Sequence, residues 1–185
     1  MSLQMRVVHF CMGLVPPLLQ SGTATEQMAL HAPKLHPMPR RMRARFTATS
    51  ENGVTRVFPK RGLRSGGALI YLHGGAYVYP MVVGQWGVVE GLIDRTGLPV
   101  IIPDYPLAPR HTASEAFDFV QPIVDEAQAE FGRVVIFGDS AGGGLALSLA
   151  MQRRDVDKRQ VDGLVLYAPW VDVTMTNPRI EEVQR

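Results

Sequence analysis

The sequence contains one cysteine, no long apolar run and almost no net charge, and each of these absences excludes a class of protein. Because Cys11 has no second cysteine to pair with, an internal disulfide framework is excluded and a reducing compartment is favoured. No apolar run approaches the roughly 20 residues that cross a bilayer. A net charge of +2 gives no global attraction to nucleic acid or to an anionic membrane. We therefore expect a cytoplasmic protein with no stable membrane insertion and no nucleic-acid partner.

Residues 1–40 differ in composition from the rest of the chain. They contain several Met, Pro and His residues, with weak helical periodicity and no strand pattern. An early arginine followed by apolar residues resembles a secretory signal, which is the alternative to a cytoplasmic location. His9 and the pair Pro16-Pro17 interrupt that apolar run, and no small-x-small cleavage site follows it. We therefore interpret residues 1–40 as a segment that covers an active site and residues 41–185 as the main domain.

A β-hairpin is predicted within residues 41–62. Strand-type residues alternate on either side of Asn52-Gly53, and Asn-Gly supplies the positive φ angles that a tight turn requires. The same region carries a basic group, Arg40, Arg41, Arg43 and Arg45. This group could attract an anionic surface, but a solvated strand face is the interpretation that we favour.

Beyond the hairpin, apolar strands alternate with helices. The pattern predicts strands over 68–73, 98–105, 133–138 and 161–169, and helices over 84–97, 112–132 and 140–154. Gly97 should end the first helix, and Thr112 with Glu115 should cap the second. An apolar stripe in the second helix, which Pro122 should bend and not end, runs through Ala116, Phe119, Val120, Ile123 and Ala127. The alternation predicts a doubly wound α/β fold with a mostly parallel sheet that is covered on both faces.

The most informative motif is "GDSAG" (138–142), which lies between a predicted strand and a predicted helix and matches the pattern G-x-S-x-G. A side chain at such a sharp turn is held above the carboxyl edge of the sheet, and its neighbours at minus two and plus two must be small. Ser140 is therefore a candidate nucleophile, with an ordinary Gly-Ser loop as the alternative. A phosphate-binding loop is disfavoured because no Gly-Lys-Ser/Thr ending follows.

A second motif, "HGGAY" (73–77), follows the strand predicted over 68–73. Gly74, Gly75 and Ala76 leave backbone N–H groups uncovered by bulky side chains. Together with the N–H of Ala141 at the start of the next helix, they would form an oxyanion hole. Each donor in such a hole stabilises a transition state by about 3 kcal/mol. A plain turn is the alternative interpretation.

Four motifs, "HGGAY", "DYPLAPRH" (104–111), "GDSAGGG" (138–144) and "APWVDVT" (168–174), occur in the order and approximate spacing of one known family. The chain resembles the hormone-sensitive-lipase-like esterases, also called the HGGG or α/β-hydrolase-3 group, over roughly residues 45–175. The resemblance implies an α/β-hydrolase fold whose residues before about 40 correspond to a helical cap. It also implies hydrolysis of small or short-acyl carboxylesters with no cofactor and no metal.

The resemblance also implies roles for individual residues. It makes Ser140 the nucleophile and His73 a residue that orients the oxyanion loop and is not the catalytic base. The remaining positions that it implies are Gly75, Ala76 and Ala141 as oxyanion donors, Gly74 as a residue that shapes the loop, and Asp139 as a structural residue near the site. The chain departs from the family at three positions, because Ala76 replaces a commoner glycine, Pro106 an arginine and Arg110 a glutamate.

The acid and the base of a catalytic triad are missing from the expected places. In this family the order is Ser, then Asp or Glu, then His, but all five histidines precede Ser140: His9, His31, His36, His73 and His111. Asp172 matches a structural position of the family instead. We therefore expect a chain without the last strands of the fold, with little or no activity by itself. The strand over 161–169 would then be an exposed edge that invites a homodimer.

A non-catalytic small-molecule receptor on the same fold and an amidase or deacetylase are the alternatives to an esterase. The aromatic residues Tyr77, Tyr79, Trp86 and Trp170 suggest an apolar pocket, with ordinary core packing as the alternative.

Overall fold

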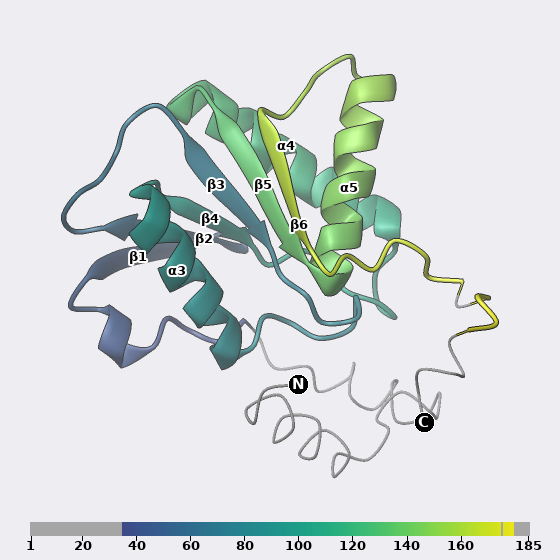
Figure 1. Cartoon of the computed structure of the whole chain (residues 1–185), viewed down its shortest axis with the longest axis horizontal. Coiled ribbons are helices and arrows are strands. Elements are labelled where there is room, and N and C mark those ends of the chain that lie inside the picture. The colour runs from purple at the N-terminus through teal and green to yellow at the C-terminus, as the bar shows by residue number, and fades with distance from the viewer. Residues whose placement is uncertain (1–34, 175, 180–185) are drawn as a thin grey trace, which may run out of the picture. The chain divides into compact units, whose positions relative to one another are not determined.

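Six strands form one mixed sheet in the part of the chain that the structure, a computed structural model, describes, residues 35–174 and 176–179 (Figure 1). They are β1 (Phe46–Glu51), β2 (Val54–Pro59), β3 (Ala68–Leu72), β4 (Val100–Pro103), β5 (Val134–Asp139) and β6 (Gly163–Tyr167). Their order is β1-β2-β4-β3-β5-β6. The pairs β1–β2 and β2–β4 are antiparallel, and the pairs β4–β3, β3–β5 and β5–β6 are parallel. The predicted fold class, a mostly parallel α/β sheet, is confirmed.

In the same described residues, three α-helices accompany the sheet: α3 (Trp86–Thr96), α4 (Ala113–Phe131) and α5 (Ser140–Asp155). Two short 3₁₀ turns, η1 (Arg40–Met42) and η2 (Val83–Gln85), precede β1 and α3. Most of the N-terminal segment predicted over 1–40 lies outside the described residues, so the expected cap and the division of the chain at residue 40 stay predictions. Among the described helices, none is long and apolar enough to cross a membrane.

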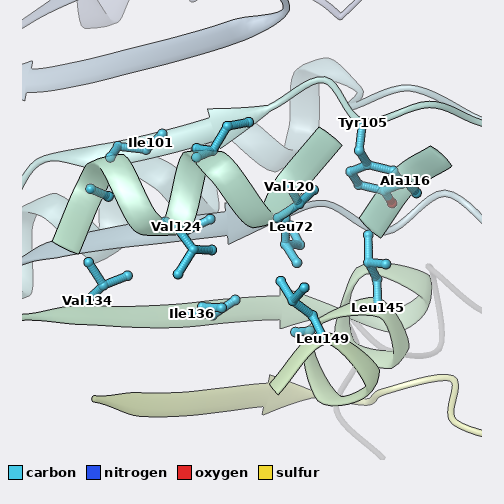
Figure 2. Packing of buried hydrophobic residues seen from close by; sticks show 14 of the residues in the cluster. Leu72, Ile101, Tyr105, Ala116, Val120, Val124, Val134, Ile136, Leu145 and Leu149 are labelled. Atoms are coloured by element: carbon cyan, nitrogen blue, oxygen red, sulfur yellow. The ribbon is translucent and has the colours of Figure 1, made fainter. Parts of the chain in front are cut away.

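The two faces of the sheet bury different sets of residues, as the alternation of side chains along β3 requires. Leu69 and Tyr71 point to the face that packs against α3, whereas Ile70 and Leu72 point to the face of α4 and α5. All five residues of β3 are buried because the strand lies between β4 and β5 and both faces are covered. Figure 2 shows the second of these clusters, in which Leu72 and Ile136 of the sheet meet the helices.

The predicted ends of the helices are confirmed. Gly97 has a φ of 69° and its N–H bonds to the carbonyl of Ile93, which ends α3. Thr112 and Glu115 form the capping box of α4, and this helix continues through Pro122. Phe119 differs from the rest of its predicted stripe because it is only half-buried. Its ring covers the hairpin turn, where a Cβ built on Gly53 would lie 3.0 Å from the ring carbon Cζ.

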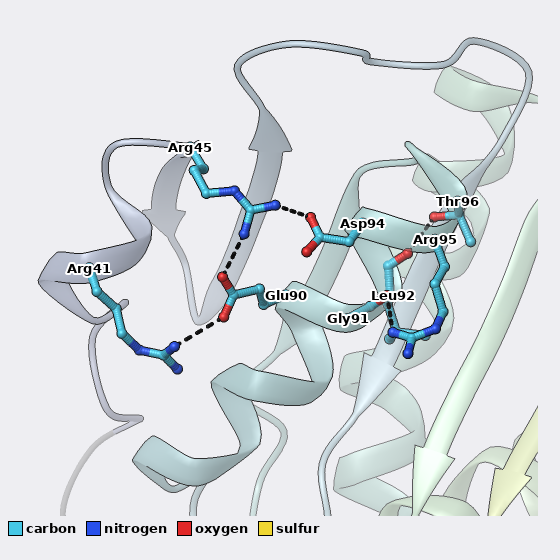
Figure 3. A network of polar contacts seen from close by, with 8 residues as sticks. All are labelled: Arg41, Arg45, Glu90, Gly91, Leu92, Asp94, Arg95 and Thr96. Carbon is cyan, nitrogen blue, oxygen red and sulfur yellow. Dashed lines mark hydrogen bonds and ion pairs between the residues drawn. The ribbon is translucent and has the colours of Figure 1, made fainter.

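The hairpin of β1 and β2 is also confirmed, since Asn52 and Gly53 both have positive φ, 49° and 76°. Part of the basic group beside it is neutralised within the protein. Arg41 lies 3.2 Å from Glu90 of α3, and Arg45 bonds to both Glu90 and Asp94 (Figure 3). These exposed ion pairs contribute little to stability, but they favour the interpretation of a solvated surface.

The other border of the sheet is β6, whose second edge pairs with no strand among the described residues. Its side chains alternate: Leu164 and Leu166 pack against the core of α4 and α5, whereas Val165 and Tyr167 remain 47% and 70% exposed. Both Val165 and Tyr167 are large and lack charge. This border is therefore an open apolar edge.

Candidate active site

Ser140 occupies a strained bend between β5 and α5. It has a φ of 50°, in the left-handed region that residues other than glycine and asparagine rarely adopt. The preceding Asp139 is still in extended conformation, with a φ of −108° and a ψ of 142°. The Ser140 side chain is half-exposed while Ala141 is fully buried. The bend therefore presents one hydroxyl at the carboxyl end of β5 and starts a helix directly behind it.

The glycines on both sides of Ser140 permit this bend. A Cβ on Gly138 would lie 2.4 Å from the carbonyl oxygen of Gly142. A Cβ on Gly142 would lie 2.0 Å from the carbonyl oxygen of Leu72, at the end of β3. Both distances are far inside van der Waals contact, and both neighbours are backbone atoms. The requirement for small residues at minus two and plus two is therefore confirmed.

The predicted oxyanion loop lies against this bend. A Cβ built on Gly74 would lie 3.1 Å from the Cβ of Ser140. Gly75 has a φ of 149° and approaches Tyr79 so closely that a Cβ would lie 2.2 Å from its carbonyl oxygen. Ala76 follows with a φ of 52°, so the residue that departs from the family pattern adopts a conformation in which alanine is strained.

The N–H groups of Gly75 and Ala76 contact no acceptor in the described part of the chain. Both residues are half-exposed. The first N–H groups of α5, including that of Ala141, are also free of intrahelical bonds because no preceding turn supplies a carbonyl. The structure thus brings together Ser140 and unbonded donors from two segments that are distant in the sequence.

Asp139 connects these two segments. Its Oδ1 accepts hydrogen bonds from the Gly74 N–H at 2.9 Å and from the Tyr71 hydroxyl at 2.7 Å. Its Oδ2 accepts from Nε2 of Gln85 at 3.3 Å. Burial raises the pKa of Tyr71 above its ordinary range, and the neighbouring Asp139 raises it further, so the hydroxyl stays protonated and donates.

His73 is buried beside the loop, and its ring forms no hydrogen bond with Ser140. Its Nδ1 lies 2.9 Å from the carbonyl oxygen of Gly74, and its ring stacks on Tyr105 at a centroid distance of 4.5 Å. Burial lowers the pKa of His73, so the ring is neutral near pH 7. Because the carbonyl is an acceptor, Nδ1 carries the proton. The opposite nitrogen, Nε2, has no partner among the described residues.

No described side chain forms a hydrogen bond with the Ser140 hydroxyl. His111 pairs instead with Glu115 at 3.0 Å on the surface. The hydrogen bond from His111, with further bonds from Thr112, lowers the pKa of Glu115 to about 2. Asp172 is exposed and accepts from the backbone N–H of Thr174 at 2.9 Å. The structure therefore brings the predicted nucleophile and the predicted oxyanion donors together, and none of the described acidic or histidine side chains bonds to the Ser140 hydroxyl.

An apolar cavity of about 510 Å³ lies beside α5, near the bend. Tyr77 of the oxyanion loop and Trp170, whose rings are 5.8 Å apart, both line it. Trp170 also donates its backbone N–H to the carbonyl oxygen of Ser140 at 2.8 Å. Of the four aromatic residues that suggested a pocket, these two fit that interpretation. Trp86 belongs to the core of α3, and Tyr79 does not line this cavity.

Within residues 35–174 and 176–179, no group of three His, Cys, Asp or Glu side chains is arranged to hold a metal ion.

Two residues near the site were not predicted from the sequence. Tyr71 lies within an apolar strand. Because a buried tyrosine hydroxyl needs a hydrogen-bond partner, its position could have indicated a polar contact near the site. Gln85 gave no signal, because its partners Gly74 and Asp139 lie 11 and 54 positions away in the sequence.

Comparison with known proteins agrees with this geometry. A family described as the alpha/beta hydrolase fold matches residues 69–185. The chain is 37% identical over 147 residues to a Mycobacterium tuberculosis protein provisionally named the acetyl-hydrolase LipR, covering 75% of this chain and 47% of that protein. It is 34% identical over 127 residues to the ethyl acetate hydrolase of Pseudomonas putida, covering 63% of this chain and 39% of that protein.

A solved structure from Staphylococcus aureus, provisionally described as an esterase, has a TM-score of 0.77 at 24% identity and covers 90% of this chain and 59% of its own. At this identity the likeness concerns the fold alone. The chain spans about half or less of the length of the curated relatives that it matches.

Proposed function

Because the chain belongs to the hormone-sensitive-lipase-like family of α/β-hydrolases, we propose that it is a serine carboxylester hydrolase whose nucleophile is Ser140. The observation that carries the proposal is the strained Ser140, half-exposed and in contact with a loop whose N–H groups at Gly75 and Ala76 have no acceptor in the described structure. The strain at Ser140 costs free energy in the resting protein, and the N–H groups of Gly75 and Ala76 remain available to bond a substrate oxyanion.

In the proposed reaction, Ser140 Oγ attacks the carbonyl carbon of the ester and loses its proton to a base. The carbonyl oxygen becomes an oxyanion and accepts hydrogen bonds from the N–H groups of Gly75, Ala76 and Ala141. Collapse of this intermediate expels the alcohol, which takes up the proton, and leaves an acyl group on Ser140. Water then attacks the acyl group and releases the acid.

The substrate class follows from the relatives. One is named for hydrolysis of ethyl acetate and another for removal of acetyl groups, so we propose small esters with short acyl chains. The apolar cavity beside α5 offers nearby surface for the uncharged part of such a molecule.

None of the three histidines in the described structure bonds to the Ser140 hydroxyl, since His36 is exposed, His73 is buried on Gly74 and His111 pairs with Glu115. We therefore expect this chain alone to acylate slowly. Oxyanion stabilisation without an activated nucleophile retains only a small part of the rate enhancement of such enzymes.

The test is covalent labelling of the full chain by a fluorophosphonate, together with p-nitrophenyl acetate and butyrate as substrates. We expect slow labelling that mass spectrometry locates on the peptide containing Ser140, and its loss in Ser140→Ala. Ser148→Ala is the matched control, because Ser148 lies on the same helix and lines the apolar cavity but is not at the bend. Labelling that persists unchanged in Ser140→Ala would contradict the proposal.

Rapid turnover that depends on Ser140 would contradict the expectation of a slow chain. It would mean that His73 or His111 is recruited as a base, which His73→Ala and His111→Ala would distinguish.

One observation favours a second function, a non-catalytic small-molecule receptor on this fold: no described side chain bonds to the Ser140 hydroxyl. A receptor should not react with the fluorophosphonate at all.

A further inference from the structure

We propose that Gln85 is a positioning residue that aims the N–H of Gly75, and with it the oxyanion loop, at the substrate of Ser140. This inference rests on the proposed function. It concerns a residue of η2, which lies outside the motifs that identify the nucleophile and the oxyanion loop.

The argument begins with one peptide group. The carbonyl of Gly74 and the N–H of Gly75 belong to the same planar trans unit, so they point in opposite directions. The Gly74 oxygen is held by Nε2 of Gln85 at 3.2 Å and by Nδ1 of His73 at 2.9 Å. Holding this oxygen therefore turns the Gly75 N–H away from both side chains. In that direction the N–H meets no acceptor in the described structure.

The Gln85 side chain has one orientation that satisfies its neighbours. Its Oε1 accepts from the backbone N–H of Val82 at 2.9 Å, which places the amide nitrogen on the other side. That nitrogen carries two protons, and two acceptors are available, the Gly74 carbonyl at 3.2 Å and Asp139 Oδ2 at 3.3 Å. If the amide were flipped, its oxygen would face two acceptors, the Gly74 carbonyl and Asp139 Oδ2. Its NH₂ group would face another donor, the Val82 N–H.

Gln85 also joins the two halves of the site. One bond goes to the loop after β3 and the other to the carboxylate directly before Ser140. Asp139 in turn holds the N–H of Gly74 at 2.9 Å. The residue Gly74 is thus fixed at both its N–H and its C=O, although the backbone that follows is strained at Ala76 and Tyr77, with φ of 52° and 60°. Without the Gln85 bond, His73 alone would hold the Gly74 carbonyl, and the Gly74–Gly75 peptide could rotate far enough to turn the Gly75 N–H away from the substrate.

The test compares Gln85→Met, which keeps the size but no hydrogen bond, with Gln85→Glu, which keeps the acceptor for Val82 but sets a carboxylate oxygen against the Gly74 carbonyl and Asp139. Gln121→Met is the matched control, the same change at an amide whose partner is the surface residue Asp157. The first readout is backbone hydrogen exchange of the full chain, which needs no turnover. We expect the hydrogen-bonded N–H groups of this loop, those of Gly74, Val78 and Tyr79, to exchange at least about 10-fold faster in both Gln85 variants, with β3 unchanged.

The second readout is acylation of Ser140 by p-nitrophenyl acetate. A misdirected donor weakens only the transition state, so we expect kcat for acylation to fall by about 10- to 100-fold with KM unchanged. Wild-type exchange in residues 74–79 of Gln85→Met, or a wild-type acylation rate, would overturn the proposal. Faster exchange that extends through β3 would overturn it as well, because Gln85 would then support the whole fold. If wild-type protein fails to label at Ser140, the proposed function is wrong, and the exchange result still decides the role of Gln85.

Discussion

The contact between α5 and β3 at Gly142 predicts a large effect from the addition of one methyl group. In Gly142→Ala the new Cβ would lie 2.0 Å from the carbonyl oxygen of Leu72 and 2.5 Å from that of His73. Ordinary contact begins at 3.4 Å, so the first distance is 1.4 Å too short. Both oxygens belong to backbone at the end of a buried strand, and no flexible side chain can move to make room.

The magnitude follows from this geometry. Adding a methylene to a well-packed core costs about 1–3 kcal/mol. Since backbone must move on both sides, we expect Gly142→Ala to lower the free energy of unfolding by about 3 kcal/mol, at the upper end of that range. For a chain of this size the loss corresponds to a decrease of about 6–12 °C in Tm.

The assay is thermal unfolding followed by circular dichroism, with urea unfolding as a second measure. Gly87→Ala is the matched control, because Gly87 is an exposed helical glycine and a Cβ there would meet nothing within 4 Å. In α3 this change should stabilise the helix slightly, by up to about 1 kcal/mol. If Gly142→Ala unfolds at the same temperature as Gly87→Ala, the contact between α5 and β3 is not as close as the structure describes, and the account of the bend is wrong.

Two further predictions concern the sheet edge and the buried histidine. We expect the open edge of β6 to cause self-association, which size-exclusion chromatography with light scattering should detect at high concentration. Val165→Lys should abolish it and Val156→Lys, an exposed position outside the strand, should not; a wild-type monomer at all concentrations would contradict the prediction. Because burial lowers the pKa of His73, the unfolded chain binds a proton more readily than the folded one. The contribution of His73 to the free energy of unfolding should therefore be fully present above the histidine pKa of the unfolded chain, about 6.5. Below that pH it should fall by up to about 1.4 kcal/mol per pH unit. Urea unfolding between pH 7.5 and about 5.5, where carboxylates titrate little, should show a smaller decrease in His73→Asn than in wild type; equal slopes would mean that His73 does not carry the effect.

Local patterns were sufficient to predict much of this fold. The Asn52-Gly53 turn, the cap at Thr112 and the stop at Gly97 depend on neighbouring residues, so the sequence reveals them directly. The bend at Ser140 could be predicted for the same reason, because the five consecutive residues 138–142 contain both the serine and the small neighbours that the bend needs.

Features that depend on distant contacts could not be predicted in this way. Strand β4 lies between β2 and β3, an order that no local pattern specifies. Phe119 is less buried than the rest of its predicted stripe, and its ring also lies against the hairpin turn at Gly53, far away in the sequence. Tyr71 and Gln85 reach Asp139 across 68 and 54 positions, the first through the pairing of β3 with β5 and the second from the turn η2.

The register of β6 has a consequence for chemistry as well as for assembly. Tyr167, the last residue of β6, lies opposite Asp139, the residue directly before Ser140. Any strand that joined β6 in parallel would deliver the residues following its own carboxyl end to the neighbourhood of that hydroxyl. An acidic or imidazole side chain could thus reach the nucleophile from a newly paired segment, without a change in the backbone already present. Among the described residues, this unpaired edge of β6 is therefore the place where a joining strand could bring a proton acceptor to Ser140.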